Sequence, residues 1–260
     1  MPDFIIWSAP NELYEKHIHL CLEAWKRIAN RFVPTLRRLF NLHQNIVNDF
    51  IQSTILCHDI GKLTQPWQEN IHLPKDERKN KSKPPHATLG APYLMDFFIT
   101  ENDDLKNAGS LAILMHHLDS GLAKANLEYP AEDSINRGLV KYGTEEFRWA
   151  DGAEDAFQRS CDQIAIPGLK FNPLSSIKLH DLEKIAQRLR LWSRCPKQIE
   201  QHQHRLQALA IHHILKVCDW RAAAQRPQIE HDEDEEGEKV ESPEWHQSIL
   251  NIYLQGGILP

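Results

Sequence analysis

The stretch IQSTILCHDIGKL, residues 51–63, joins the end of an apolar segment to the polar pair His58-Asp59. The apolar periodicity that leads into this pair predicts a buried helix, and Gly61 is a residue suited to ending it. A histidine and a carboxylate side by side at such a helix end can bind one metal ion. Their mixed nitrogen and oxygen donors suit Mn, Fe, Co, Ni or Zn better than Ca. Lys62 follows within one turn, where its ammonium group can meet a phosphate as a point charge.

A bare His-Asp pair is more often a capped helix end with a surface histidine than a metal site, and the chain holds two further pairs as controls. His180-Asp181 lies at the start of a helix with a polar face, where aspartate is a favourable first-turn residue. His231-Asp232 lies in an acidic run. Neither pair follows a buried apolar segment, so only the pair at 58–59 is kept as a metal-site hypothesis.

Apolar residues recur with helical periodicity along most of the chain, whereas the alternation typical of strands is scarce. Prolines such as Pro34 separate the periodic segments. We therefore predict an all-α fold. The expected helices cover 11–33, 45–60, 88–100, 107–117, 176–193 and 200–225.

Two regions fall outside this helical pattern. Residues 120–175 are irregular, and we expect an insertion with one or two short helices there. Residues 228–244 are acidic and almost without apolar side chains, which favours a solvated segment over a linker or a partner-docking segment. The predicted organisation is one domain over 1–225, followed by the acidic segment and the C-terminal tail over 226–260.

The composition indicates an ordinary globular protein, because 41% of its 260 residues are apolar and 25% are charged. No apolar run approaches the roughly 18–20 residues of a membrane-spanning helix, and the first residues do not resemble a secretory signal. The five cysteines form no C-x-x-C pair, which excludes a zinc ribbon and favours a reducing, cytoplasmic compartment. The net charge of −6 means that any contact with nucleic acid must be local, and the 15 histidines direct attention to metal chemistry.

Further histidines stand at the ends of expected helices. His116-His117 closes the apolar run NAGSLAILMHH, and His86 follows a double proline just before the helix at 88–100. Adjacent residues diverge by about 100° on a helix, so an isolated histidine pair is usually one buried and one exposed residue. An isolated His86 would by default be a loop residue. At helix ends, however, all three histidines can reach one site.

Helical periodicity indicates which of His17 and His19 faces inward in the first expected helix. His17 shares an apolar stripe with Leu20, Ala24 and Ile28. His19 lies about 200° round the helix and should face solvent. A histidine within an apolar stripe is either a core residue with satisfied hydrogen bonds or an inward-facing ligand, and both interpretations of His17 stay open.

Asp219 lies in the middle of the apolar helix at 200–225. A carboxylate in such a position is costly unless it is paired or bound to a metal. Ala222 and Ala223 share its face and leave room for another group to approach. His212, two turns earlier on the same face, is a lesser candidate for a supporting role.

Together these positions supply seven nitrogen or oxygen donors, each at the end or on the buried face of an expected helix. Seven donors are enough for two metal ions with one bridging carboxylate, the arrangement used for in-line phosphoryl displacement. The seven residues are His17, His58, Asp59, His86, His116, His117 and Asp219.

The order of these residues resembles that of the HD superfamily of metal-dependent phosphohydrolases. Within it, the chain is most similar to the CRISPR-associated HD nuclease of type I interference systems. That family has a His, then His-Asp with a following Gly-Lys, then His, His-His and a distant Asp. The likeness covers roughly residues 10–225 and includes the Asp-Trp pair at 219–220. It implies an HD-domain helical bundle in which the helix over 45–60 is central, with an HD nuclease domain over 1–225.

The resemblance also implies a site with two divalent metal ions (Mn, Fe, Co, Ni or Mg) bridged by Asp59, with Asp59 and Lys62 as catalytic residues. Lys62 would contact the scissile phosphate. The implied reaction is hydrolysis of single-stranded DNA by a two-metal mechanism, with a CRISPR helicase subunit or domain and a guide-RNA surveillance complex as partners. One ion would be held by His17, His58, Asp59 and Asp219, and the other by Asp59, His86, His116 and His117.

Three alternatives remain open. An HD-GYP cyclic-dinucleotide phosphodiesterase also carries HDIGK and His-His, but it normally continues with Glu and then Gly-Tyr-Pro, whereas this chain reads HHLDSGLAKA. A one-metal HD nucleotide phosphohydrolase would leave His86, His116 and His117 without a role. A catalytically inactive scaffold module is disfavoured because every ligand position is filled.

A basic stretch, KDERKNKSK at 75–83, lies between two of the expected ligands and holds four lysines and one arginine against two acids. Its Lys79, Lys81 and Lys83 are candidates for guiding single-stranded DNA towards the site. The alternative is a solvated loop that contacts nothing.

Overall fold

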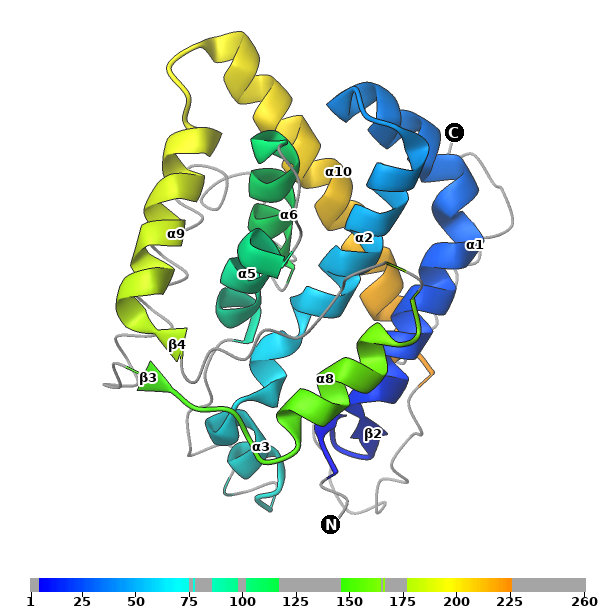
Figure 1. The fold of residues 1–260 in the computed structure, drawn as a ribbon, viewed down its shortest axis with the longest axis vertical. Coiled ribbons are helices and arrows are strands. Elements are labelled where there is room, and N and C mark those ends of the chain that lie inside the picture. Colours follow the sequence, from blue (N-terminus) through cyan, green and yellow to red (C-terminus); the bar gives the residue numbers. More distant parts are fainter. Residues whose placement is uncertain are drawn as a thin grey trace, which may run out of the picture.

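The computed structural model describes residues 5–74, 77, 86–97, 102–116, 146–164, 166 and 177–225. Within these ranges the chain is almost entirely helical, as predicted (Figure 1). Two short antiparallel pairings accompany the helices. β1 (Trp7–Ala9) pairs with β2 (Glu12–Leu13), and β3 (Glu146–Phe147) pairs with β4 (Ile177–Lys178).

The six helices predicted from periodicity are all present, and apart from the end of the first their bounds differ from the expected ones by a few residues. Short helices that the sequence pattern did not specify separate some of them. In chain order the helices are α1 (Tyr14–Phe40), α2 (Gln44–His58), η1 (Ile60–Leu63), α3 (Gln65–Ile71), α5 (His86–Phe97), α6 (Asp103–Met115), α8 (Ala153–Cys161), α9 (Leu179–Ser193) and α10 (Gln198–Ala223).

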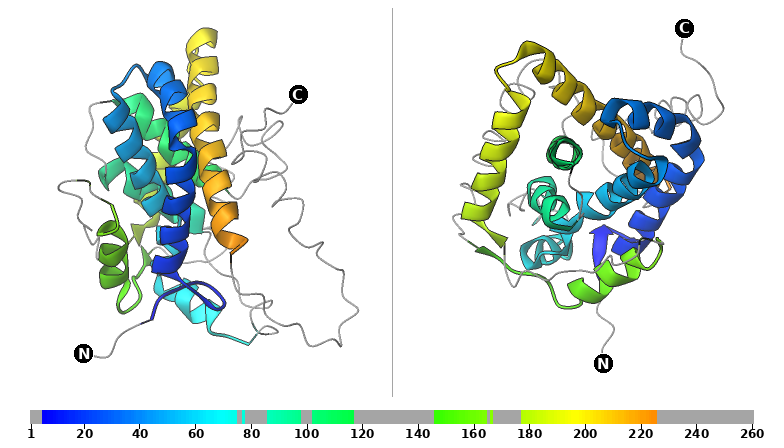
Figure 2. Two further views of the ribbon diagram at one scale, coloured as in Figure 1. Left: turned by 90° about the vertical axis from the view of Figure 1, so that its right-hand side faces the viewer. Right: turned by 45° about the horizontal axis from the view of Figure 1, so that its top comes forward.

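Helix α2 lies at the centre of the bundle, as expected, in contact with α1, α5, α6 and α10 (Figure 1). Its side chains Phe50, Ile51, Ile55 and Leu56 are buried in the core. On its far side α10 runs beside α1, which Figure 2 shows from a second direction. The C-terminal end of α2 is therefore surrounded by other helices, and polar side chains there are withdrawn from water.

The first helix does not end before Pro34, as the sequence pattern had suggested, but continues to Phe40. Leu36 and Phe40 are buried while Pro34 is exposed, so core packing carries the helix past the residue that interrupts its hydrogen bonds. The helix changes direction in its last turns (Figures 1 and 2), which is the usual effect of an internal proline. Asn41, in the left-handed conformation with φ 52°, then ends it.

The region expected to be an irregular insertion, 120–175, is described only at 146–164 and 166. There it forms one short helix, α8, which packs against α1. The remainder of that insertion, the basic stretch apart from residue 77, and the acidic segment and tail at 226–260 lie outside the described residues. None of the helices in the described ranges has the length and apolar character needed to cross a membrane.

Candidate metal centre

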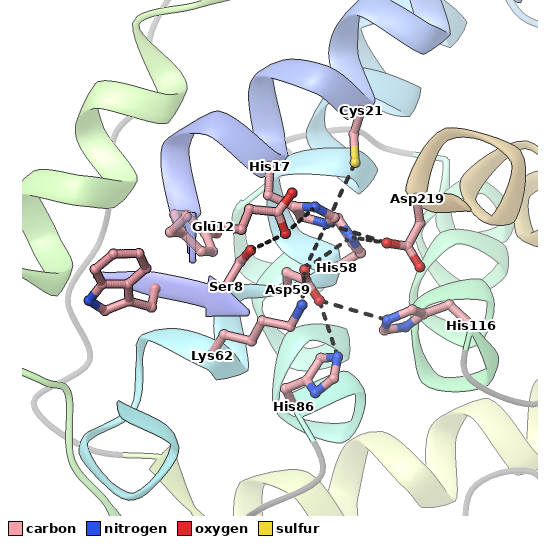
Figure 3. Close-up of polar contacts among 12 residues, drawn as sticks. Ser8, Glu12, His17, Cys21, His58, Asp59, Lys62, His86, His116 and Asp219 are labelled. Atoms are coloured by element: carbon pink, nitrogen blue, oxygen red, sulfur yellow. Dashed lines mark hydrogen bonds and ion pairs between the residues drawn. The ribbon is translucent and has the colours of Figure 1, made fainter. Parts of the chain in front are cut away.

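Six of the seven predicted ligands converge at the C-terminal end of α2 (Figure 3). Four of the six stand at helix ends that meet in the core, and the other two project from the faces of α1 and α10 that pack against them. His17 comes from α1, His58 is the last residue of α2 and Asp59 follows it, His86 opens α5, His116 follows α6, and Asp219 projects from α10. The seventh, His117, lies outside the described residues.

The carboxylate of Asp59 lies between two groups of imidazoles. Its Oδ2 is 3.1 Å from His17 Nε2 and 3.4 Å from His58 Nε2. Its Oδ1 is 3.1 Å from His86 Nε2 and 3.8 Å from His116 Nε2. Each oxygen of this one carboxylate therefore faces a different pair of histidines.

Asp219 completes the first group. Its Oδ1 lies 3.3 Å from His17 Nε2 and 4.0 Å from His58 Nε2. These contacts explain how a carboxylate is accommodated on the inward face of α10, near the C-terminal end of that helix. His212, for which the sequence suggested a supporting role, places its Nε2 3.1 Å from the backbone oxygen of Met115. This contact joins α10 to the last residue of α6, directly before His116.

The imidazoles are oriented by hydrogen bonds on their other nitrogen. His58 Nδ1 lies 2.6 Å from the backbone oxygen of Ile55, and His116 Nδ1 lies 2.6 Å from that of Ile113. Since a carbonyl can only accept, each Nδ1 carries the proton, and each Nε2 is left with its lone pair facing the centre. A backbone or carboxylate partner on the second ring nitrogen is the usual arrangement of metal-binding histidines.

His17 is oriented by a carboxylate that sequence analysis did not single out. Glu12 Oε2 lies 3.3 Å from His17 Nδ1, and the same oxygen accepts a 2.7 Å hydrogen bond from Ser8 Oγ. Both residues belong to the β1–β2 hairpin, which Gln68 holds in place through the backbone N–H and oxygen of Trp7. No local spacing in the sequence connects a buried glutamate to this histidine, so the contact could not be foreseen.

The electrostatics favour ionised carboxylates and a neutral His58, whereas the pKa of His17 is raised well above its usual value: burial lowers it, but Cys21, Asp219 and Asp59 raise it by more. Burial opposes ionisation of Asp59, but His58 and Lys62, together with hydrogen bonds from His17 and His86, hold its pKa well below the usual value. The Lys62 amine lies 2.6 Å from Asp59 Oδ2. Burial lowers the pKa of His58, so that this ring is neutral near pH 7 and its Nε2 is available as a donor.

These residues fit a divalent metal ion. His58 Nε2 is fully buried, and among the described residues it has no hydrogen-bond partner. Such an atom is costly in a protein interior unless something binds it. Neutral imidazoles with carboxylates form the donor set of divalent transition metals. The donor atoms of His58, Asp59 and His116 lie within 4.8 Å of one another.

The expected difference between His17 and His19 is present: His17 is fully buried and His19 is exposed, with its Nδ1 3.1 Å from Gln163 Oε1. We expect His17→Ala to lower metal affinity by at least tenfold, because it removes a donor where even loss of a hydrogen-bonded neighbour costs about 10–100-fold. His19→Ala should bind metal like the unmodified protein. Isothermal titration with Mn²⁺ measures both, and equal losses in the two variants would contradict the assignment of the inward face.

Comparison with known proteins agrees with this geometry. The family model described as "Cas3, HD domain" matches residues 17–247. The chain belongs to the Cas3 HD domain family. The resemblance seen in the order of histidines and aspartates is thus confirmed, and these matches give no support to the HD-GYP or nucleotide phosphohydrolase alternatives.

Two curated relatives of this Cas3 HD family member are each named CRISPR-associated endonuclease Cas3-HD. That of Pyrococcus furiosus is 26% identical over 111 residues, covering 39% of this chain and 44% of the relative. That of Methanocaldococcus jannaschii is 25% identical over 114 residues, covering 41% and 46%. The chain thus spans less than half the length of the curated relatives it matches.

A solved structure shares the fold. The CRISPR-associated Cas3 HD domain protein of Methanocaldococcus jannaschii aligns with a TM-score of 0.56 at 18% sequence identity, covering 82% of this chain and 99% of the other. At that identity the alignment establishes the HD-domain fold alone. The Cas3 HD assignment itself rests on the family match.

Proposed function

We propose that this chain is a metal-dependent HD nuclease that hydrolyses phosphodiester bonds of single-stranded DNA in CRISPR interference. The position of Asp59 supports this proposal most directly. Its two carboxylate oxygens face two separate pairs of histidines, at 3.1 and 3.4 Å on one side and 3.1 and 3.8 Å on the other. A carboxylate shared in this way is what a pair of ions acting on one phosphodiester requires.

In the proposed site His17, His58, Asp59 and Asp219 hold one divalent ion, and Asp59, His86, His116 and His117 hold the other. Each of these ions is a divalent Mn, Fe, Co, Ni or Mg. When bound, such ions lower the pKa of a water molecule and neutralise the charge of the phosphate oxygens. The protein contributes fixed donors: the backbone bonds of His58 and His116 and the Glu12 contact of His17 keep each Nε2 directed inward.

The substrate phosphate would reach the site at its least buried side chains. The exposed fractions are 15% for the Asp219 side chain, 10% for His86 and 7% for Lys62, against 0–1% for His17, His58 and Asp59. Lys62 would contact the scissile phosphate there as a point charge. The Lys62 Nζ lies over the Trp67 ring, 5.8 Å from its centre, in a cation–π contact.

The burial of most of these donors favours a single strand over a duplex, because a rigid double helix cannot easily bring its backbone to ions held among helices. The proposed partners follow from this substrate. A guide-RNA surveillance complex displaces one DNA strand, and a CRISPR helicase subunit or domain, acting in the cytoplasm, feeds that strand to the nuclease.

The decisive experiment combines metal analysis of the purified protein with cleavage assays on single-stranded DNA, duplex DNA and a cyclic dinucleotide. We expect two equivalents of divalent metal and metal-dependent cleavage of single-stranded DNA, with duplex resistant until it is opened. Preference for the cyclic dinucleotide would favour the HD-GYP alternative. One equivalent of metal with mononucleotide turnover would favour a nucleotide phosphohydrolase, and full metal content without turnover would favour a scaffold.

The basic stretch at 75–83 offers a second test. Replacing Lys79, Lys81 and Lys83 together with alanine should weaken binding of single-stranded DNA. It should reduce the slope of log affinity against log salt by about 2, since each phosphate contact on a single strand contributes about 0.7. Hydrolysis of a small chromogenic phosphodiester should stay nearly unchanged, because such a substrate is too short to reach the loop.

A matched control removes the same number of positive charges elsewhere. Arg27, Arg37 and Arg38 are exposed on α1, and their triple alanine variant should bind DNA with the unmodified salt dependence. Equal loss on the DNA and on the small substrate would indicate a damaged metal centre. Unchanged DNA binding in the lysine variant would leave the stretch at 75–83 as a solvated loop.

A further inference from the structure

Cys21 lies one turn after His17 on α1 and points into the same centre (Figure 3). Its side chain is fully buried, and its Sγ is 3.7 Å from His17 Nε2. The donor atoms of His17, Cys21, His58 and Asp219 all lie within 4.8 Å of one another. A sulfur atom is therefore part of the first ligand group, although the order of histidines and aspartates that identifies the family contains none.

Three separations within this group are close to those of donors that share one metal ion. Bonds of about 2.0–2.1 Å to nitrogen or oxygen and about 2.3 Å to sulfur place neighbouring donors about 3.3–3.6 Å apart. The observed separations from His17 Nε2 are 3.7 Å to Cys21 Sγ and 3.3 Å to Asp219 Oδ1, and His58 Nε2 lies 4.0 Å from the same oxygen. The other separations in the group are at most 4.8 Å, so these donors are close enough to share one ion after the side chains adjust.

A second observation points to the same position independently of the cysteine. His58 Nε2 is fully buried, is directed into the group by the bond of its Nδ1 to Ile55, and has no hydrogen-bond partner among the described residues. An ion between His58 and Cys21 would use both the nitrogen lone pair and the sulfur.

We propose that Cys21 is a sulfur ligand of the ion held by His17, His58, Asp59 and Asp219, and that this centre selects a borderline ion such as Co²⁺, Zn²⁺, Fe²⁺ or Ni²⁺ over Mg²⁺. Thiolate sulfur favours such ions, whereas magnesium prefers oxygen ligands. On binding, the sulfur–metal bond replaces the S–H bond, and the proton passes to solvent. This inference deepens the proposed function, because it rests on the metal centre proposed above.

The chain offers a matched control for this cysteine. Cys218 is also fully buried and directly precedes the ligand Asp219, yet it lies outside the group of donors that surrounds His17. Cys21→Ser and Cys218→Ser therefore remove one buried sulfur each, and only the first removes a sulfur from the proposed site.

The test is a titration of the full chain with Co²⁺, followed by absorption spectroscopy. We expect visible d–d bands together with a near-ultraviolet sulfur-to-cobalt charge-transfer band. Cys21→Ser should lose the charge-transfer band and keep the d–d bands, with Co²⁺ affinity at least about tenfold lower and Mn²⁺ affinity changed much less. Cys218→Ser should match the unmodified protein. Cys21→Ala, with far-ultraviolet circular dichroism on each variant, separates loss of sulfur from loss of fold.

The two proposals fail in different ways. Visible cobalt bands without a charge-transfer band in the unmodified protein, or a charge-transfer band that survives in Cys21→Ser, would overturn the sulfur ligand and leave the metal centre standing. Absence of any cobalt band would overturn the metal centre itself, and the sulfur ligand with it.

Discussion

Replacing Asp59 with alanine is expected to remove both metal ions and to lower DNA cleavage by about 10³-fold or more. The reason is its position: one oxygen faces His17 and His58, and the other faces His86 and His116. Loss of one shared ligand weakens both ion sites at once. Because bound ions contribute several kcal/mol of transition-state stabilisation, and each 1.36 kcal/mol is a factor of ten in rate, a drop of about 10³-fold follows.

Metal-induced thermal stabilisation measures this effect apart from activity. An ion that binds only the folded protein raises its melting temperature, so the unmodified protein should respond to Mn²⁺ and Asp59→Ala should not. Because the substitution leaves the Lys62 ammonium, 2.6 Å away, without its carboxylate, Asp59→Asn serves as a second variant that keeps the side-chain size. His86→Ala, which removes a donor from one side only, should retain part of the response.

Asp49→Ala is the matched control, since Asp49 lies on the same helix but outside the cluster. Its metal response and its activity should equal those of the unmodified protein. If Asp59→Ala kept a full response to metal, the carboxylate would not be shared between two ions, and the two-metal proposal would fail.

Periodicity was sufficient to predict the large helices, because each of them buries one face in a common core. It also placed His17 inward and Asp219 on the buried face of α10, as observed. It failed where tertiary packing overrides a local signal. Pro34 was expected to end the first helix, but burial of Leu36 and Phe40 carries that helix onward.

The site itself was predicted in part. Ligands at helix ends follow from the sequence pattern, whereas Glu12 comes from a hairpin whose strands are too short to leave a periodic signal. Cys21 could have been found, because it lies four residues after His17 and residues at that spacing share a helix face. The role of Lys79, Lys81 and Lys83 stays a prediction from charge alone.

Gly61 has a structural role, but it differs from the one that the sequence pattern suggested. A glycine after a buried helix suggested a left-handed helix end, but α2 ends at His58, and Gly61 lies in η1 without a positive φ. A glycine is needed at this position because there is no space for a side chain. A Cβ at Gly61 would lie 2.4 Å from the backbone oxygen of His86 and 2.6 Å from its Cα. The turn after His58-Asp59 therefore packs directly on the backbone of His86, another of the proposed ligands.

Gly61→Ala is accordingly expected to displace His86 from Asp59. Overpacking of this kind costs about 1–3 kcal/mol of folding stability. Because the clashing atoms are backbone, His86 must move as a whole, and its 3.1 Å contact to Asp59 Oδ1 is lost. The folded fraction should then bind about one equivalent of metal instead of two and cleave DNA poorly. Urea unfolding and metal analysis of the gel-filtered protein measure the two effects separately.

Gly109→Ala distinguishes a displaced ligand from general overpacking. A Cβ there would meet the Phe50 ring at 2.4 Å and the Leu94 side chain at 2.7 Å, so the clash falls on core side chains and not on a ligand backbone. Both variants should lose stability, but Gly109→Ala should keep the full metal content in its folded fraction. If Gly61→Ala also kept both ions, His86 would not be a ligand whose position depends on this contact. If both variants lost metal equally, the centre would be sensitive to core packing in general, and the tight turn after Asp59 would have no special part in building it.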